Sequence, residues 1–267
     1  MKLELHEKVL TNLFDTNNKL NFFDIGSCEG LSSVRYLNIF KKCNIYAFES
    51  IPNNFSEVLK NKKKHGLDNL HAYEIGLSSK KGTATFYVSS GKPPNKDTPE
   101  DNSTDFGNKS SSLFKPGKTK EVHPWLKFKE SITIKTDTLE NFCLEKKVET
   151  IDFIHMDVQG AELMVLQGAN SMLKNIKSIW LEVEKVPLYE GQALKTDIEN
   201  FLIKNNFKLI LNKVNHIAGD QFWVRQDYFN KLSDKTKSHL NSISKKVALK
   251  SKLSSAIGKI KDRIKKT

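Results

Sequence analysis

The chain has 267 residues and a formal net charge of +12 at pH 7. A chain of this length can fold as one large α/β domain that buries roughly 70–75% of the surface exposed by its unfolded state, so it needs no disulfides. Three features exclude other classes of protein. Cys28, Cys43 and Cys143 lack the spacing of a disulfide framework or zinc knuckle, no run of about 18 apolar residues predicts a membrane span, and residues 1–13 do not resemble a signal peptide. We therefore expect a cytoplasmic protein.

The first part of the chain alternates predicted helices with short apolar strands. Helical spacing of apolar residues predicts helices at 1–21, 31–40 and 53–65, and apolar runs predict strands at 21–26, 44–49 and 70–75. This alternation predicts a parallel sheet with right-handed crossovers.

An insertion at about 83–136 interrupts the alternation. It contains predicted strands at 82–89 and 131–136, which are candidate partners, and a polar segment at 90–120 that is typical of a functional cover or a disordered insertion. Strands are then predicted at 151–157, 176–184, 207–212 and 221–225, the last as an antiparallel hairpin partner, and helices at 161–173 and 194–205. We expect a domain over residues 1–228 with a mostly parallel seven-stranded sheet and helices on both faces, followed by a basic helical tail at 229–267.

The positive charge is concentrated in this tail. Residues 230–267 hold eleven Lys and one Arg against two Asp, which is +10 of the +12. Its apolar residues lie roughly on one stripe: Ile243, Val247, Leu253, Ile257, Ile260 and Ile264. An interfacial helix that touches an anionic membrane or a partner is one interpretation. A solvated basic helix that packs on the body is the other.

A glycine turn, DIGSCEG, follows the first predicted strand at residues 24–30. Gly26 permits a tight turn and a close approach by a ligand, and Gly30 permits close packing of the next helix. Free N–H groups at the start of that helix suit an anionic group. The turn lacks the middle glycine of the dinucleotide fingerprint, which disfavours a nicotinamide or flavin cofactor. A plain strand-to-helix turn is the alternative.

Two further acids end predicted strands. Glu49 follows the glycines by some 20 residues, where an acid can accept hydrogen bonds from both ribose hydroxyls of an adenosine. Asp157 ends the strand IDFIHMD and opens the turn VQGAE. Ligands of open α/β sheets bind beyond the carboxyl ends of the strands, so Asp157 points at the same crevice. Helix capping is a second, compatible role.

These motifs resemble the FkbM family of S-adenosylmethionine-dependent methyltransferases. DIGSCEG, YAFESIPNNF, IDFIHMDVQGAELMVLQGA and SIWLEVE occur in the order and spacing of that family across residues 21–225, and SITIKTDTLENF resembles the stretch before the third block. The resemblance implies the class I methyltransferase (Rossmann-like) fold, S-adenosylmethionine as cofactor, and an acceptor hydroxyl on a sugar, glycan or related small molecule.

The resemblance also implies a cofactor site. Asp24, Gly26, Ser27 and Gly30 would line the methionine end, Glu49 with the adjacent Ser50 would hold the ribose, and Ile75 and Gly76 would lie beside the adenine. The chain departs from the family at Ser27-Cys28, often Ala-Asn, and at Gln159, often glutamate. The second departure argues against a base or metal ligand at 159. One of Ser110, Ser111 and Ser112 is a candidate contact for cofactor or acceptor.

An alcohol acceptor must lose its proton, which a nearby base assists. Asp157 is the first candidate for this base, followed by His155 on the same strand and by Glu182. Glu184 is a further candidate, and His216, in a polar loop, is a weaker one. Glu182 and Glu184 share one side of their strand, so with Asp157 they could bind a divalent metal or grip acceptor hydroxyls. We assign no metal.

Two rival functions remain open. The basic tail favours an RNA methyltransferase acting on a ribose or cap hydroxyl, but the body is nearly neutral and lacks a basic stripe. Asp157, Lys185 and Glu182 could supply only part of the Lys-Asp-Lys-Glu site that ribose 2′-O enzymes need. The other rival is a non-catalytic binding module whose tail docks on a membrane or partner. A peripheral membrane location is also compatible with catalysis on a lipid-linked glycan.

Overall fold

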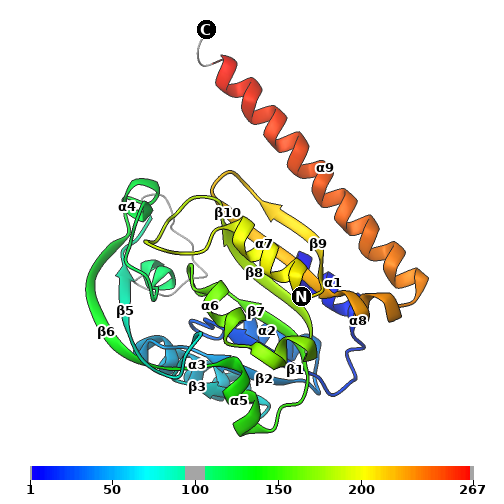
Figure 1. The fold of residues 1–267 in the computed structure, drawn as a ribbon, viewed down its shortest axis with the longest axis horizontal. Helices are drawn as coiled ribbons and strands as arrows, with labels where there is room; N and C mark the ends of the chain where they lie inside the picture. Colours follow the sequence, from blue (N-terminus) through cyan, green and yellow to red (C-terminus); the bar gives the residue numbers. More distant parts are fainter. Residues whose placement is uncertain (1, 94–105, 265–267) are drawn as a thin grey trace.

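The computed structural model describes residues 2–93 and 106–264, with side chains as far as Leu249. Its main sheet has seven strands in the order β3-β2-β1-β7-β8-β10-β9, and all neighbours are parallel except β10, which runs antiparallel to β8 and β9 (Figure 1). The strands are β1 (Asn21–Ile25), β2 (Asn44–Phe48), β3 (Leu70–Tyr73), β7 (Ile151–Met156), β8 (Ile176–Glu184), β9 (Phe207–Val214) and β10 (Ala218–Arg225). The predicted seven-stranded, mostly parallel sheet is therefore confirmed, including its antiparallel end.

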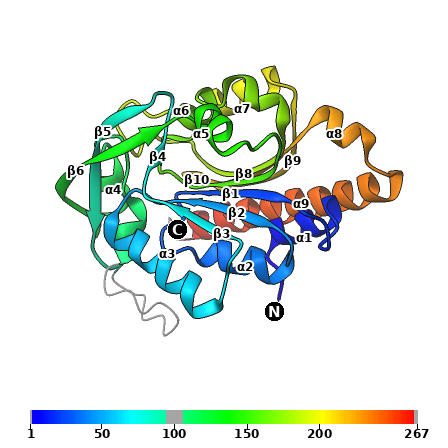
Figure 2. The same cartoon turned by 90° about the horizontal axis from the view of Figure 1, so that it is seen from below.

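Helices cover both faces of this sheet (Figure 2). One face carries α1 (Leu5–Leu13), α2 (Leu31–Ile39), α3 (Pro52–His65) and α9 (Asp234–Ile264), and the other carries α5 (Leu139–Lys146), α6 (Glu162–Gln167) and α7 (Lys195–Lys204). Each face has its own apolar core. Val9, Tyr36, Val58 and Leu240 are buried on the first face, and Phe142, Val165, Ile198 and Leu202 on the second. Because β1, β2, β3, β7 and β8 run parallel, their carboxyl ends meet at one edge of the sheet.

The insertion forms a second sheet beside that edge. β5 (Gly82–Ser90) pairs antiparallel with β6 (Lys127–Asp137), and β4 (Gly76–Leu77) pairs parallel with the end of β6. The predicted pairing of the two inserted strands is thus confirmed. Between them lie η1 (Phe106–Ser110) and α4 (Thr119–Val122).

Two predicted helices are shorter in the structure than the sequence indicated. The predicted helix at 1–21 is wrong beyond Leu13, because Asp15 accepts a hydrogen bond from the backbone of Asn17 at 2.8 Å and starts a turn. The predicted helix at 161–173 ends at Gln167 and is followed by the 3₁₀ turn η2 (Asn170–Asn175). Gly168 lies against the backbone of Ser78 there, where a Cβ would come within 2.1 Å of the carbonyl oxygen.

The basic tail is helical in its described part. A short helix, α8 (Gln226–Lys231), leads into α9, where Leu240 is buried and Ile243 and Val247 pack against the core. The far half of α9 extends away from the body (Figure 1). The predicted stripe beyond it, at Leu253, Ile257, Ile260 and Ile264, lies outside the described side chains.

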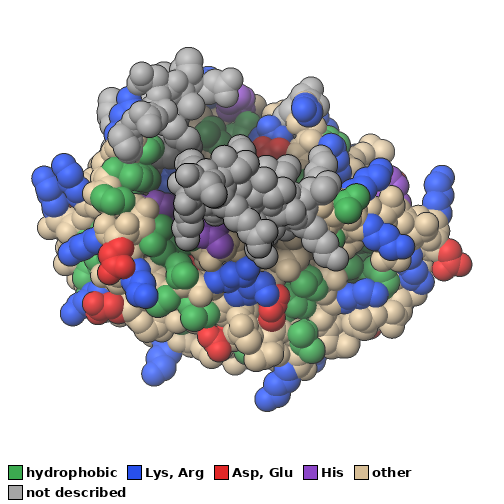
Figure 3. All heavy atoms as spheres, turned by 90° about the horizontal axis from the view of Figure 1, so that it is seen from above, with side chains coloured by type: hydrophobic (Ala, Val, Ile, Leu, Met, Phe, Trp, Pro, Cys, Tyr) green, Lys and Arg blue, Asp and Glu red, His purple; other side chains and the backbone are tan. Residues whose placement is uncertain are grey.

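The surface of the body shows no single basic stripe on the face seen in Figure 3, where Lys and Arg side chains are scattered among apolar and acidic ones. None of the described helices combines the length and the apolar character needed to cross a membrane.

Candidate active site

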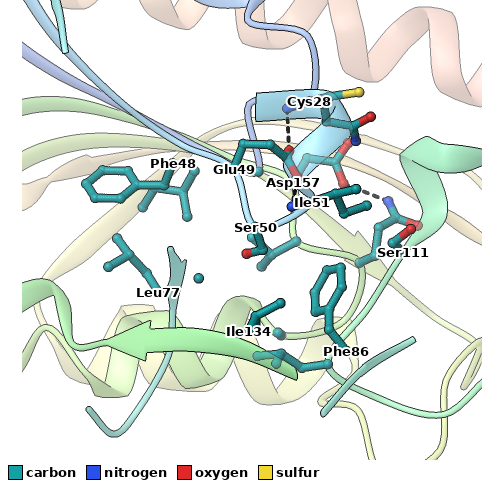
Figure 4. Close-up of a pocket in the computed structure, with 18 of the residues that line it drawn as sticks. Cys28, Phe48, Glu49, Ser50, Ile51, Leu77, Phe86, Ser111, Ile134 and Asp157 are labelled. Carbon is teal, nitrogen blue, oxygen red and sulfur yellow. Dashed lines mark hydrogen bonds between the residues drawn. The ribbon is translucent and has the colours of Figure 1, made fainter. Parts of the chain in front are cut away.

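A cleft opens beyond the carboxyl ends of β1, β2 and β7 (Figure 4). The main sheet and its loops contribute Gly26, Cys28, Phe48, Glu49, Ser50, Ile75, Gly76 and Asp157 to its lining, and the insertion contributes Phe86, Asn108, Lys109, Ser111, Leu113 and Ile134. The insertion therefore forms the second wall of the cleft. The sequence offered Ser111 as a candidate here, but it gave no signal for Lys109 or Phe86, because only the hairpin geometry brings them to the strand ends.

Glu49 is the most constrained polar group in this cleft. Its side chain is buried, its Oε2 accepts a hydrogen bond from the backbone N–H of Cys28 at 2.8 Å, and its Oε1 accepts one from Ile51 at 2.8 Å (Figure 4). Burial raises the pKa of Glu49 to about 7, against the opposing effect of the Ile51 and Cys28 bonds. Each oxygen keeps a free lone pair, so the carboxylate is oriented to accept two further hydrogen bonds.

The apolar part of the cleft suits a flat aromatic ring. Phe48, Leu77, Phe86 and Ile134 surround it, with Ile75 and Gly76 close by. The cleft encloses about 60 Å³, less than small-molecule sites usually offer.

A second cavity continues from this cleft along the glycine turn. The two share Gly26, Cys28, Lys109 and Asp157, and the second adds Asp24, Ser27 and His155. The Oγ of Ser27 is buried without a hydrogen-bond partner in the described part of the chain. An unpaired donor beside the start of α2 fits the polar methionine end of S-adenosylmethionine, so the chemistry of both cavities matches that cofactor.

Gly26 is held where no side chain fits. It has φ +79°, and a Cβ would lie 2.0 Å from the carbonyl oxygen of Asp157. We expect Gly26→Ala to lower the unfolding temperature clearly, because it adds a backbone clash to a strain of about 1–3 kcal/mol. The matched control is Gly66→Ala, with φ +60° but nothing within 4 Å, which should cost only about 1 kcal/mol. Equal destabilisation by both changes in thermal denaturation would contradict this account.

Gly30, which the resemblance placed at the methionine end of the cofactor, is not among the residues that line the two cavities. It caps α2 with φ +74°, and a Cβ would meet the side chain of Val58 on α3 at 3.2 Å. It therefore serves the close packing of two helices. The other residues predicted at the cofactor site, Asp24, Gly26, Ser27, Glu49, Ser50, Ile75 and Gly76, all line one or both cavities.

Asp157 is exposed to the joined cavities and is held by Gln159. The side-chain amide of Gln159 donates to Asp157 at 2.6 Å and to Glu182 at 2.9 Å, while its oxygen lies 2.8 Å from the hydroxyl of Tyr189. An amide can bridge two carboxylates in this way, and a glutamate at position 159 could not. The departure from the family at position 159 argues only against a base or metal ligand there and does not predict these contacts.

Glu182 and Glu184 differ from Asp157 in their surroundings. Neither lines the cleft or the cavity at the glycine turn. Burial and the nearby Asp157 raise the pKa of Glu182 to about 9, and burial with Glu162 raises that of Glu184 to about 10. Both are neutral acids at pH 7, which argues against the predicted role of Glu182 as a base. Within the described ranges, no three Asp, Glu, His or Cys side chains are arranged to hold a metal ion.

The protonated state of Glu184 predicts a pH-dependent stability. Its pKa is near 10 in the folded chain and near 4.5 when unfolded, so the folded state holds the extra proton and loses stability as pH rises between these values. We expect Glu184→Gln to flatten this loss, and to raise the unfolding temperature more at pH 9 than at pH 6. Glu190→Gln, at an exposed position, is the control and should leave the slope unchanged. If the unfolding temperature changed with pH in the same way for the parent, Glu184→Gln and Glu190→Gln, the prediction would be contradicted.

The two histidine candidates lie in different places. The Nδ1 of His155 lies 2.8 Å from the hydroxyl of Tyr36, and its ring borders the cavity at the glycine turn. His216 is exposed in the turn between β9 and β10 and borders none of the cavities described here.

The fold and the site together define a class I S-adenosylmethionine-dependent methyltransferase. The sequence profile of the "Methyltransferase FkbM domain" matches residues 24–209, which is more than half of the chain. The chain therefore belongs to the FkbM family of methyltransferases, and the predicted family and cofactor are confirmed.

Individual proteins resemble the chain more distantly. It is 28% identical over 218 residues to the 2-O-methyltransferase NoeI of Sinorhizobium fredii (strain NBRC 101917 / NGR234), covering 82% of this chain and 84% of that one. The precorrin-6y C5,15-methyltransferase of Geobacter metallireducens GS-15 is 12% identical, with TM-score 0.44 and coverage of 82% and 86%. A SAM-dependent methyltransferase of Aquifex aeolicus is 12% identical, with TM-score 0.42 and coverage of 84% and 100%. The assignment rests on the family match and not on these structures.

Proposed function

We propose that the chain is an O-methyltransferase that acts on a hydroxyl of a sugar, glycan or related small molecule. The observation that carries this proposal is the junction of the two cavities, where the exposed carboxylate of Asp157 lies beside Gly26. The resemblance to a 2-O-methyltransferase supports oxygen as the acceptor atom.

Along the joined cavities, different residues bind different parts of the cofactor. Glu49 accepts hydrogen bonds from the ribose, Phe48 and Ile134 enclose the adenine, and Ser27 with the free N–H groups at the start of α2 binds the methionine end. When bound, S-adenosylmethionine supplies a methyl group on a sulfonium centre, ready for in-line attack. Such a reaction depends mainly on how the protein positions the reacting atoms.

Asp157 is the base in this proposal. It accepts the proton of the acceptor hydroxyl as the oxygen attacks, and Gln159 fixes the direction of its carboxylate. Glu182 shares the same amide, and its pKa of about 9 makes it a poorer base at neutral pH. Burial also raises the pKa of Asp157, while the hydrogen bond from Gln159 opposes this rise and favours the carboxylate.

The function is tested by binding and by transfer. Calorimetry should show that the full chain binds S-adenosylmethionine and S-adenosylhomocysteine. Incubation with methyl-labelled cofactor and a panel of glycosides should label an ether oxygen, as read by mass spectrometry. Absence of binding by either compound, or label only on nitrogen or carbon, would contradict the proposal. Labelled RNA in place of glycosides would instead favour the nucleic-acid alternative.

A further inference from the structure

A polar cavity lies beside the active site, on the side away from the adenine cleft. It is bounded by α1, α2 and the ends of β8 to β10, and encloses about 380 Å³, within the range of small-molecule sites. It shares Ser32 and His155 with the cavity at the glycine turn, which in turn contains Asp157. Ser32 and His155 therefore lie between the polar cavity and the cavity that holds the proposed base.

The wall of the polar cavity holds three acids, Glu4, Glu7 and Asp220, against two cations, Arg35 and Lys213. Arg35 donates to the carboxylate of Glu7 through Nε at 2.8 Å and through Nη2 at 2.7 Å, and Lys213 lies 3.9 Å from Asp220. Burial lowers the pKa of His6 to about 3, so this ring is neutral. The third acid of the wall, Glu4, leaves the wall without surplus positive charge. Such a wall does not favour a phosphate or carboxylate group on the ligand.

Aromatic and imidazole rings that contact one another form the inner side of the polar cavity. His6 stacks on Trp180 with centroids 5.1 Å apart, and the hydroxyl of Tyr36 lies 3.0 Å from the Nε2 of His6 and 2.8 Å from the Nδ1 of His155. At the rim, Asp220 and Lys213 keep 35% and 61% of their side-chain surface exposed, so they can meet a ligand. Aromatic walls with a few placed polar groups are typical of specific small-molecule sites.

We propose that the polar cavity is the acceptor subsite and that it takes a neutral saccharide, with Asp220 and Lys213 binding hydroxyls that are not methylated. The inference rests on the proposed function and goes beyond it, because it assigns the place and the charge class of the acceptor. A saccharide matches this wall since each hydroxyl can both donate to Asp220 and accept from Lys213. The target hydroxyl then reaches Asp157 past His155.

The three tryptophans, Trp125, Trp180 and Trp223, make the test direct. Trp180 borders the polar cavity, whereas Trp223 is buried in the other core and donates to Gln221. The full chain loaded with S-adenosylhomocysteine is titrated with neutral methyl glycosides (glucoside, galactoside, mannoside, fucoside and N-acetylglucosaminide) while the indole N–H signals are followed by NMR. The Trp180 signal is assigned with Trp180→Phe. We expect a glycoside to shift Trp180 and to leave Trp223 in place.

Variants of the rim then test the assignment. Asp220→Asn and Lys213→Gln should each raise the glycoside Kd about tenfold, the effect of losing one hydrogen bond to a charged group, with unchanged affinity for S-adenosylhomocysteine. Asp68→Asn, an exposed acid just before β3 at the far edge of the sheet, is the control and should change neither affinity.

Four results would overturn the inference. The first is a glycoside that binds without shifting the NMR signal of Trp180, and the second is a glycoside Kd that neither rim variant changes. The third is binding of a nucleotide diphosphate sugar while neutral glycosides do not bind. The fourth is no binding by any compound of the set. Failure to bind S-adenosylhomocysteine is distinct from these, because it would contradict the proposed function itself.

Discussion

Replacing Glu49 by alanine should raise the Kd for S-adenosylhomocysteine at least about 100-fold, because two hydrogen bonds from ribose hydroxyls to a charged, buried acceptor are lost together. The carboxylate is prepared for this role by the backbone N–H groups of Cys28 and Ile51, each at 2.8 Å. Titration calorimetry measures the effect directly. Glu57→Ala, on the exposed side of α3, is the control and should bind as the parent does.

The pKa of Glu49 adds a second measurement. Since this pKa is raised to about 7, the carboxylate is half protonated near neutral pH and loses acceptor capacity below it. Affinity for S-adenosylhomocysteine should therefore fall as pH drops from 8 to 6, by up to about tenfold per pH unit below the pKa. In Glu49→Ala this dependence should disappear. A parent profile that is flat over this range would show that another group holds the ribose.

Much of the fold could be predicted from local sequence. Each parallel strand is a short apolar run that ends in a charged or glycine residue, and β8 occupies the predicted range 176–184. Helix ends were harder, because they depend on contacts far away in the sequence. The end of α6 lies where Gly168 approaches the backbone of Ser78, and no local sequence pattern predicts this contact between distant residues.

The same division applies to the site. Gly26, Glu49 and Asp157 follow strands directly, so their position at the carboxyl edge could be predicted. Lys109 and Phe86 reach the cleft only because the β5–β6 hairpin folds back over the strand ends.

The role of Gln159 could not be derived from the sequence for a related reason. A glutamine in place of an expected glutamate argued against a base or metal ligand at this position, whereas in the structure its amide joins Asp157 to Glu182. The meaning of that residue depends on the second carboxylate, 23 positions away on β8.

Replacing Asp157 by asparagine should reduce turnover at least about 100-fold, the usual contribution of a general base, while the affinity for S-adenosylhomocysteine stays within about tenfold. Asparagine keeps the shape of the side chain but cannot accept the proton of the acceptor hydroxyl. Labelled-methyl transfer to the accepted glycoside gives the rate, and calorimetry gives the affinity. Asp227→Asn, at an exposed site, is the control. Turnover that survives in Asp157→Asn would place the base elsewhere, and His155 would then be the next candidate.

Gln159→Glu distinguishes an oriented base from a merely structural acid. The new carboxylate removes a donor from Asp157 and adds a negative charge beside it, so the pKa of Asp157 must rise. The acid side of the pH–rate profile should then move to higher pH, and turnover should recover in part as pH increases. A purely structural loss would lower the rate by the same factor at every pH. An unmoved profile would therefore separate Gln159 from proton transfer, even if the rate itself fell.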